Sequence, residues 1–172
     1  MHRSAEGDRD QPADVTLIAA LSRDRVIGAG DRMPWDVPEE YAGYVETVRG
    51  ATVVFGRRSY EIFGADLDDS ELVVLTRNAD LGGVATAADV ADALRQAFAT
   101  GRPVYVAGGA SVYTAALPYA TRMRLSTIHG DFNGDTFFPE FSPGEWPVER
   151  ETVHDRFTLR EHARVGEPAP LV

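Results

Sequence analysis

PVYVAGGASVY, residues 103–113, is the stretch of sequence that decides the fold class. Its first five residues predict a strand, and the glycine pair that follows them breaks it. A helix is predicted from Ala110 to about Leu117, because Pro118 cannot continue a helix. A strand that passes almost directly into a helix indicates an α/β protein.

The same pattern repeats on both sides of this stretch. Val15–Leu21 is nearly all apolar, as expected of a strand buried on both faces of a mainly parallel sheet. The patterning predicts further strands at 51–55, 71–76 and 122–128, with one helix at 57–63 and another that starts within 86–89 and ends at Gly101. Segments near 148–153 and 157–163 predict an antiparallel hairpin. The sequence therefore predicts one α/β sheet with both parallel and antiparallel strands.

Another helix is predicted ahead of residue 51. Asp36 is placed to cap it, Pro38 is tolerated in its first turn, and Glu39 completes a variant capping box. Gly50 ends this helix. Its apolar stripe has the spacing i, i+3, i+4 and i+7, and consists of Tyr41, Tyr44, Val45 and Val48.

Composition excludes several classes of function. The 172 residues include no cysteine, which excludes disulfides, thiolate nucleophiles and cysteine-ligated metals. All 17 basic residues are arginine, so the chain has no lysine for a Schiff base or a P-loop. Four histidines without ligand spacing predict no metal site. A net charge of −10 argues against nucleic acid as a partner.

The two ends of the chain lie outside the patterned region. Residues 1–14 are polar, which predicts a disordered extension and no signal peptide. Residues 15–163 form the predicted single domain, and residues 164–172 a flexible tail. No apolar run approaches 18 residues, so no membrane span is expected. We expect a cytoplasmic monomer that binds small molecules.

Two features at strand ends suggest a phosphate site. Gly108-Gly109 would let the backbone approach a ligand closely, although a tight turn explains the pair equally well. Arg57, Arg58 and Arg77 follow strands, and ligands of open α/β sheets bind beyond the carboxyl ends of strands. Arginine suits phosphate, but solvated surface arginines would give the same pattern.

Glu40 is the third feature. It lies one residue before Tyr41 and four before Tyr44, so it borders the apolar stripe of its helix. A carboxylate beside apolar groups is costly unless it is paired, which points to a cationic or hydrogen-bond-donating ligand. The alternative is an acid that only complements the helix dipole.

Taken together, these motifs resemble those of the dihydrofolate reductase family, in the same order and spacing from Val15 to about Ala163. The motifs are Leu17–Leu21, Val26–Gly28, Met33–Trp35, Pro38–Glu40, Val54–Arg57, Val106–Tyr113 and Gly134–Pro139. The resemblance implies an eight-stranded, mostly parallel sheet with an antiparallel C-terminal strand and flanking helices. It also implies reduction of 7,8-dihydrofolate to tetrahydrofolate by hydride transfer from NADPH.

The resemblance also assigns residues to the substrate. Glu40 matches the single acid of the pterin pocket, where a carboxylate can accept two hydrogen bonds from an aminopyrimidine. Trp35 would order a water near Glu40, Ser126 replaces a threonine that supports the acid, and Met33 completes the implied catalytic set. The implied pocket lining is Ile18, Ala20, Ile27, Tyr41, Tyr44, Phe63, Leu67 and Tyr113.

The implied cofactor contacts include a mobile loop at residues 28–32 and a cis peptide at Gly108-Gly109. The full implied set is Ala20, Ile27, Gly28, Gly56, Arg57, Arg58, Ser59, Thr76, Arg77, Gly108, Gly109, Ala110, Ser111 and Val112. No acid at these strand ends suits a free ribose hydroxyl, which predicts a preference for NADPH over NADH.

The sequence departs from the family where the substrate tail is expected. Tyr41 and Tyr44 replace aliphatic and phenylalanine residues around the benzoyl ring. Ser70 stands where an arginine usually pairs with the glutamate carboxylate, and Ser111 where an arginine is frequent. The loss of the arginine at Ser70 predicts a weakly held tail.

Two other functions stay open from the sequence. One is a reductase of the same fold that reduces a ribosylaminopyrimidine in riboflavin synthesis, which Trp35 disfavours. The other is a catalytically silent nucleotide-binding module, which the retained Glu40 disfavours. The acidic, lysine-free composition has two explanations as well, since it resembles salt-adapted proteins and also follows from a GC-rich genome.

Overall fold

The computed structural model describes residues 14–28, 32–78 and 81–171. Most of the expected N-terminal extension, and the centre of the expected mobile loop, lie outside the described residues. The described strands of the main sheet are β1 (Val15–Leu21), β3 (Thr52–Gly56), β4 (Glu71–Leu75), β5 (Ala85–Ala87), β6 (Val104–Val106), β7 (Arg122–Ile128), β9 (Val148–Val153) and β10 (Phe157–Ala163).

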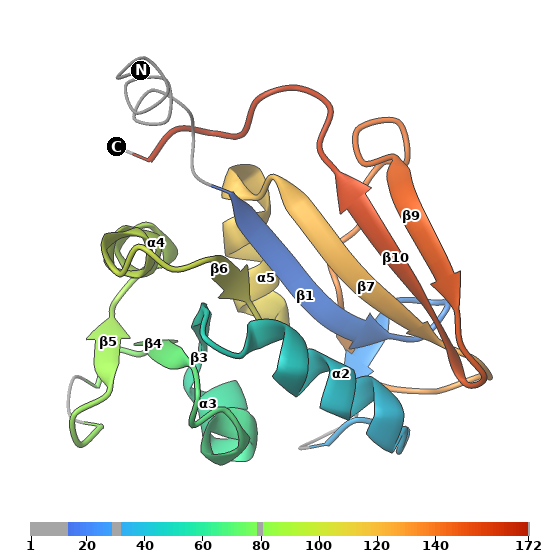
Figure 1. Cartoon of the computed structure of the whole chain (residues 1–172), viewed down its shortest axis with the longest axis horizontal. Coiled ribbons are helices and arrows are strands. Elements are labelled where there is room, and N and C mark those ends of the chain that lie inside the picture. The colour runs from blue at the N-terminus through green and yellow to red at the C-terminus, as the bar shows by residue number, and fades with distance from the viewer. Residues whose placement is uncertain (1–13, 29–31, 79–80, 172) are drawn as a thin grey trace.

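These eight strands form one twisted sheet in the order β5-β4-β3-β6-β1-β7-β10-β9 (Figure 1). Every pair from β5 to β7 is parallel, whereas β10 runs antiparallel to both β7 and β9. This topology confirms the predicted mostly parallel sheet with an antiparallel C-terminal strand. Parallel neighbours require crossover connections, and the helices supply them.

The helices cover both faces of the sheet (Figure 1). On one face, α2 (Pro38–Val48) and α3 (Arg57–Phe63) pack with Ile18, Val53 and Phe55. On the other face, α4 (Val90–Ala99) and α5 (Ala110–Ala116) pack with Leu17 and Val54. Consecutive strand residues thus serve opposite faces, as the period of two requires. No helix in the described part of the chain is long and apolar enough to cross a membrane.

Short elements are where the structure adds to the sequence prediction. The three-residue strand β5 pairs with β4, and β2 (Val26–Gly28) pairs with β8 (Thr136–Phe137) in a separate two-stranded sheet. Two single-turn 3₁₀ helices, η1 (Gly64–Asp66) and η2 (Leu117–Tyr119), follow α3 and α5. Two or three residues are too few to display a period, so the sequence pattern does not reveal such strands.

The start of α2 differs from the prediction. The residue before the first turn is Val37, and no side chain caps this helix, so the prediction that Asp36 caps it is wrong. Pro38 occupies the first turn and disfavours the helical conformation for the residue before it, and Val37, with a ψ of 85°, is not helical. At α4, by contrast, Asp89 is the cap, and its side chain accepts a hydrogen bond from the Asp92 backbone N–H at 2.8 Å.

The C-terminal segment returns across the body of the protein. The guanidinium of Arg164 donates to the backbone oxygens of Leu117 and Ala120 and lies 4.5 Å from the centroid of the Trp146 ring. The backbone N–H of Ala169 donates to the Pro118 oxygen at 2.8 Å. These contacts attach residues 164–169 to the domain at several points, while the flexibility expected of residues 164–172 stays a prediction.

Candidate active site

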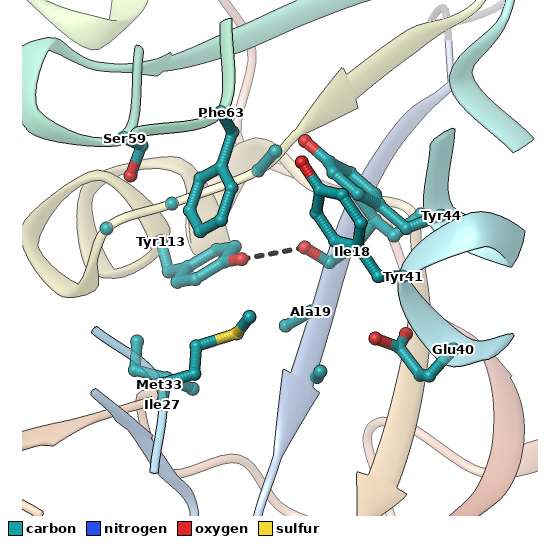
Figure 2. Close-up of a pocket in the computed structure, with 14 residues that line it drawn as sticks. Ile18, Ala19, Ile27, Met33, Glu40, Tyr41, Tyr44, Ser59, Phe63 and Tyr113 are labelled. Carbon is teal, nitrogen blue, oxygen red and sulfur yellow. Dashed lines mark hydrogen bonds between the residues drawn. The ribbon is translucent and has the colours of Figure 1, made fainter. Parts of the chain in front are cut away.

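A cavity lies at the carboxyl end of β1, between α2, α3 and α5 (Figure 2). We call it the substrate cavity. Its lining combines aliphatic and aromatic side chains with one carboxylate: Ile18, Ala19, Ala20, Ile27, Met33, Glu40, Tyr41, Tyr44, Ser59, Phe63, Ala107, Gly108, Gly109 and Tyr113. All but one of the residues predicted to line a substrate pocket are in this set.

Glu40 enters the substrate cavity from the first turn of α2 (Figure 2). Burial raises the pKa of the Glu40 carboxyl above its ordinary value, because removal from water disfavours the charged form. A hydrogen bond from the Ser126 side chain and the positive charge of Arg124 act in the opposite direction and lower this pKa. Burial thus favours the protonated form of Glu40, whereas Ser126 and Arg124 favour its carboxylate form.

Backbone geometry shapes the wall opposite α2. The peptide between Gly108 and Gly109 is cis, as the resemblance implied. Gly108 has a φ of +112°, which side chains rarely tolerate, and a Cβ there would lie 3.3 Å from the Ser59 hydroxyl. The Tyr113 hydroxyl crosses the cavity floor and donates to the Ile18 oxygen at 2.7 Å, the bond drawn in Figure 2. A side chain at Gly108 would therefore be both conformationally strained and crowded against Ser59.

Aromatic rings form the outer rim. Tyr41 lies 5.9 Å from both Tyr44 and Phe63 between ring centroids. The Tyr41 hydroxyl donates to a carboxylate oxygen of Asp66 at 2.5 Å. Burial raises the pKa of Tyr44, and the charge of Glu40 adds to this effect, so Tyr44 stays a neutral phenol. Carboxylates also mark the outer opening next to this rim, which Asp36 and Asp66 line together with Tyr41.

A second, larger groove of about 640 Å³ adjoins the substrate cavity. We call it the arginine groove, because Arg32, Arg57, Arg58 and Arg77 line it and no described acidic residue does. The carboxyl ends of β3 and β4 place Gly56 and Thr76 in it. In a chain with a net charge of −10, four arginines around one groove form a local site for an anion.

The two spaces meet. Five residues line both the substrate cavity and the arginine groove: Ile27, Met33, Ser59, Phe63 and Gly109. The groove also contains Gly28, Ala110, Ser111 and Val112, all predicted as cofactor contacts. Ala20 and Gly108, predicted for the same role, line the substrate cavity instead. A molecule that lies along the groove would thus reach the substrate cavity with one end.

Trp35 and Ser126 approach Glu40 from outside the substrate cavity. Trp35 lines the outer opening, and its ring packs edge-on against Phe132 at 5.3 Å. Its indole N–H is buried without a protein partner among the described residues, so this donor is available to a water or a ligand. Ser126, on β7, lines a separate space of about 240 Å³ behind Glu40, which we call the rear cavity.

One expected substrate contact, Leu67, does not line the substrate cavity. Leu67 is only 2% exposed and packs into the core beneath α2. The Ser70 hydroxyl donates to the Val48 oxygen at 2.7 Å and is thus directed to the end of α2. The structure also adds two residues that the sequence reading left without a site role, Thr136 in the arginine groove and Arg124 in the rear cavity. Both could have been found from the sequence. Thr136 belongs to the motif Gly134–Pro139, and Arg124 precedes Ser126 by two residues on one strand, which places both on the same face of the sheet.

An apolar cavity with one carboxylate, open to a groove lined by arginines, defines an enzyme that sets a small heteroaromatic substrate against a phosphorylated cofactor. Comparison with known proteins agrees. The sequence model for dihydrofolate reductase matches residues 14–163. The chain is 35% identical over 147 residues to dihydrofolate reductase type A13 of Escherichia coli, which covers 84% of this chain and 89% of that protein.

Two further relatives extend the similarity over more of the chain. Dihydrofolate reductase HdrB of Haloferax volcanii is 33% identical over 176 residues, which cover 93% of this chain and 88% of that protein. Among solved structures, dihydrofolate reductase from Enterococcus faecalis, complexed with NADP(H) and RAB-propyl, superposes with a TM-score of 0.76 at 28% identity. That match covers 89% of this chain and 97% of the other.

The chain belongs to the dihydrofolate reductase family. It is an oxidoreductase that reduces dihydrofolate to tetrahydrofolate with NADPH. The expected activity and cofactor are confirmed, and neither alternative function receives support from the comparisons.

Proposed function

We propose that Glu40 is the residue that holds the pterin ring and governs its proton, while the arginine groove holds the phosphates of NADPH. One observation carries this assignment. Among the described residues that line the substrate cavity, Glu40 is the only carboxylate, and it lies in a space that opens directly into the arginine groove. The chemistry needs such an arrangement, because hydride and proton must reach neighbouring atoms of one ring.

On the substrate side, the Glu40 carboxyl group forms hydrogen bonds with the amino and ring N–H groups of the pterin. Burial strengthens these bonds, since water competes less for both partners. Met33 and Ile27 line the junction of the two spaces and exclude water from it. The unpartnered Trp35 N–H holds a water close to Glu40.

The reduction adds one hydride and one proton across the double bond between C6 and N5 of dihydrofolate. NADPH, when bound, supplies the hydride to C6. The proton goes to N5, and it comes from solvent through the water beside Glu40. A carboxyl group whose pKa is raised favours proton uptake at this place, so hydride transfer is expected to slow as the pH rises.

On the cofactor side, Arg58, Arg77 and Thr76 are assigned to the 2′-phosphate of NADPH, because they line one part of the groove at the ends of neighbouring strands. Gly56, Arg57, Ser59 and the start of α5 at 110–112 face the remaining phosphates and the ribose. We assign the catalytic domain to residues 15–163. We further assign the protein to the cytoplasm, as a monomer that does not bind nucleic acid, from its composition and charge.

Replacement of Glu40 tests the assignment. Glu40→Gln and Glu40→Ala should lower turnover by about 100-fold or more, the range that a positioned proton-transfer group contributes. The dissociation constant of NADPH should stay within about twofold, because no carboxylate among the described residues lines the arginine groove. Glu39→Gln, the neighbouring and more exposed acid, is the matched control and should leave turnover unchanged. Turnover within about twofold of wild type in both Glu40 variants would refute the assignment.

A further inference from the structure

A row of charged side chains crosses the sheet behind Glu40. In the strand register, Arg124 of β7 pairs with Ile18 on one side and with Glu161 of β10 on the other. Glu161 pairs in turn with Arg150 of β9. Directly paired residues project from the same face of a sheet, and Ile18 lines the substrate cavity. Arg124, Glu161 and Arg150 therefore lie on the face that α2 covers.

The contacts within this row join opposite charges. One guanidinium nitrogen of Arg124 lies 3.4 Å from a carboxylate oxygen of Glu161, and Arg150 approaches the other oxygen at 4.0 Å. The Arg124 and Glu161 side chains are 29% and 34% exposed, so water screens this pair less than a surface pair. Arg150, at 76% exposed, ends the row in solvent.

The rear cavity brings the row to Glu40. Glu40, Ser126 and Arg124 all line this space of about 240 Å³ between α2 and the sheet. The charge of Arg124 lowers the pKa of Glu40 across it. Read from the substrate outward, the signs alternate from Glu40 through Arg124 and Glu161 to Arg150.

We propose that Arg124 is a positioning residue that shares its charge between Glu40 and Glu161, and that this division sets the upper pH limit of hydride transfer. The proposal rests on the proposed function, in which Glu40 governs the proton of the pterin. Arg124 touches neither substrate nor cofactor. Arg124 acts on Glu40 across the rear cavity. Its ion pair with Glu161 determines how strongly its positive charge stabilises the Glu40 carboxylate.

The two partners of Arg124 should have opposite effects. A nearby cation lowers the pKa of an acid and a nearby anion raises it. Loss of the Arg124 charge should therefore raise the pKa of Glu40 and extend activity to higher pH. Loss of the Glu161 charge leaves Arg124 with Glu40 alone, so this pKa should fall and activity should end at lower pH.

Other titratable groups around Glu40 do not change in these variants. Those lining its three cavities, from α2, α5, η1 and the loops, are Asp36, Glu39, Tyr41, Tyr44, Asp66, Tyr113 and His154. Since all of them remain in every variant, a difference between two variants reports on the substituted charge.

The experiment measures single-turnover hydride transfer from NADPH to dihydrofolate against pH, at constant ionic strength, in the full chain. Arg124→Met should move the midpoint of the decline upward by about half a unit, which raises the rate at high pH about threefold. Glu161→Gln should move it downward, with about a threefold loss at the same pH. Arg124→Lys, which keeps the charge, should restore the wild-type profile.

Arg122→Gln is the matched control. Arg122 lies two residues before Arg124 on the same face of β7, and it pairs with Glu149 at 3.1 Å instead of facing the rear cavity. Its profile should match wild type. Shifts of the same sign in Arg124→Met and Glu161→Gln, or no shift in either, would overturn the proposal. Should Arg124→Met fold poorly, the downward shift in Glu161→Gln still decides, because this variant keeps Arg124.

Failure of the proposed function gives a different result. In that case Glu40→Gln would keep both the rate and the pH profile of wild type. If Glu40→Gln abolishes the decline with pH and the Arg124 and Glu161 variants leave it in place, then Glu40 is correctly assigned and only the role of Arg124 is wrong.

Discussion

The substrate cavity and the arginine groove share five lining residues, yet the other side chains that line them differ in polarity and in the sign of their charge. The cavity has apolar walls, one carboxylate and further acids at its outer opening. The groove has four arginines and no described acid. Two adjoining spaces in one small protein thus present opposite electrostatic potentials to their ligands.

Under the proposed assignment, this contrast divides binding into two tasks. Charge selects and holds a polyanionic cofactor, and it does so at long range and with sensitivity to salt. Shape and one buried acid orient a nearly neutral ring, where charge would be costly unless it were paired. The acids at the outer opening then oppose any anionic extension of the ring. Each expected outcome below tests one side of this contrast.

Reversal of charge in the arginine groove should have the largest effect. Arg77→Glu removes a charge-assisted hydrogen bond to the 2′-phosphate, and such bonds contribute about 1.5–3 kcal/mol, or about 10–150-fold in the dissociation constant of NADPH. NADH lacks that phosphate and should bind with nearly unchanged affinity. Arg102→Glu gives the same net charge but lies away from the groove, next to Glu71 at 3.8 Å. Equal weakening of NADPH and NADH would show that Arg77 does not read the 2′-phosphate.

The tail of the substrate gives a smaller expected effect. No described arginine lines the substrate cavity or its outer opening, and Ser70 is bonded to the Val48 oxygen. Dihydrofolate and dihydropteroate, which lacks the glutamate, should therefore have similar KM values. Ser70→Arg should lower the KM of dihydrofolate alone, by up to about tenfold or 1.4 kcal/mol. Ser70→Gln, long but neutral, should not. A wild-type preference of tenfold for dihydrofolate would reveal another cation at the tail.

Ionisation of Glu40 should lower the stability of the folded protein. Its pKa in the folded protein is raised above the ordinary value of 4.5, so the folded state binds its proton more tightly than the unfolded state does. The ionised carboxylate therefore destabilises the fold above its folded pKa, and this cost disappears below about pH 4.5. Glu40→Gln should raise the Tm at pH 7, by about 2–4 °C for each 1 kcal/mol regained. Near pH 4 the two proteins should melt together. An equal difference at both pH values would exclude ionisation as its cause.

Salt should change stability least. The arginines outside the groove lie mostly in ion pairs, such as Arg122 with Glu149 and Arg160 with Glu151, so the excess charge is acidic. Screening of that repulsion should raise the Tm by about 1–2 °C as KCl increases toward molar levels. Over the same range NADPH should bind more weakly, because salt also screens the arginine groove. A Tm that stays level or falls in KCl would favour genome composition as the origin of the missing lysine.

How well the sequence predicts a strand of this fold depends on the length of that strand. Strands such as β1 and β7 are seven residues long and display their pattern fully, so their bounds agree with the prediction. β5 and β8 are three and two residues long, and only pairing with β4 and β2 defines them. Asp36 had the right residue type for a cap, but Pro38 fixed where the helix starts.

Prediction of the site from the sequence is limited by side-chain direction and by strand register. Motif positions singled out Glu40 and the groove arginines, which line two adjoining spaces. They could not show that Leu67 is buried beneath the cavity or that Ser70 bonds to α2, because both depend on side-chain direction. The row through Arg124 and Glu161 depends on the register between β7 and β10, which pairs these two residues although they are 37 positions apart in the chain.

The order of strands in the sheet also fixes the order in which the protein can form during synthesis. Strands β3, β4 and β5 pair with one another within residues 52–87, so they can assemble early on the ribosome. β1 is made first, yet its neighbours are β6 and β7, which end at residues 106 and 128. Synthesis must proceed from residue 21 to residue 104 before this nearly all-apolar strand has a partner in the sheet. A nascent chain that stops before residue 104 therefore presents an unpaired apolar strand, the form that chaperones and proteases recognise.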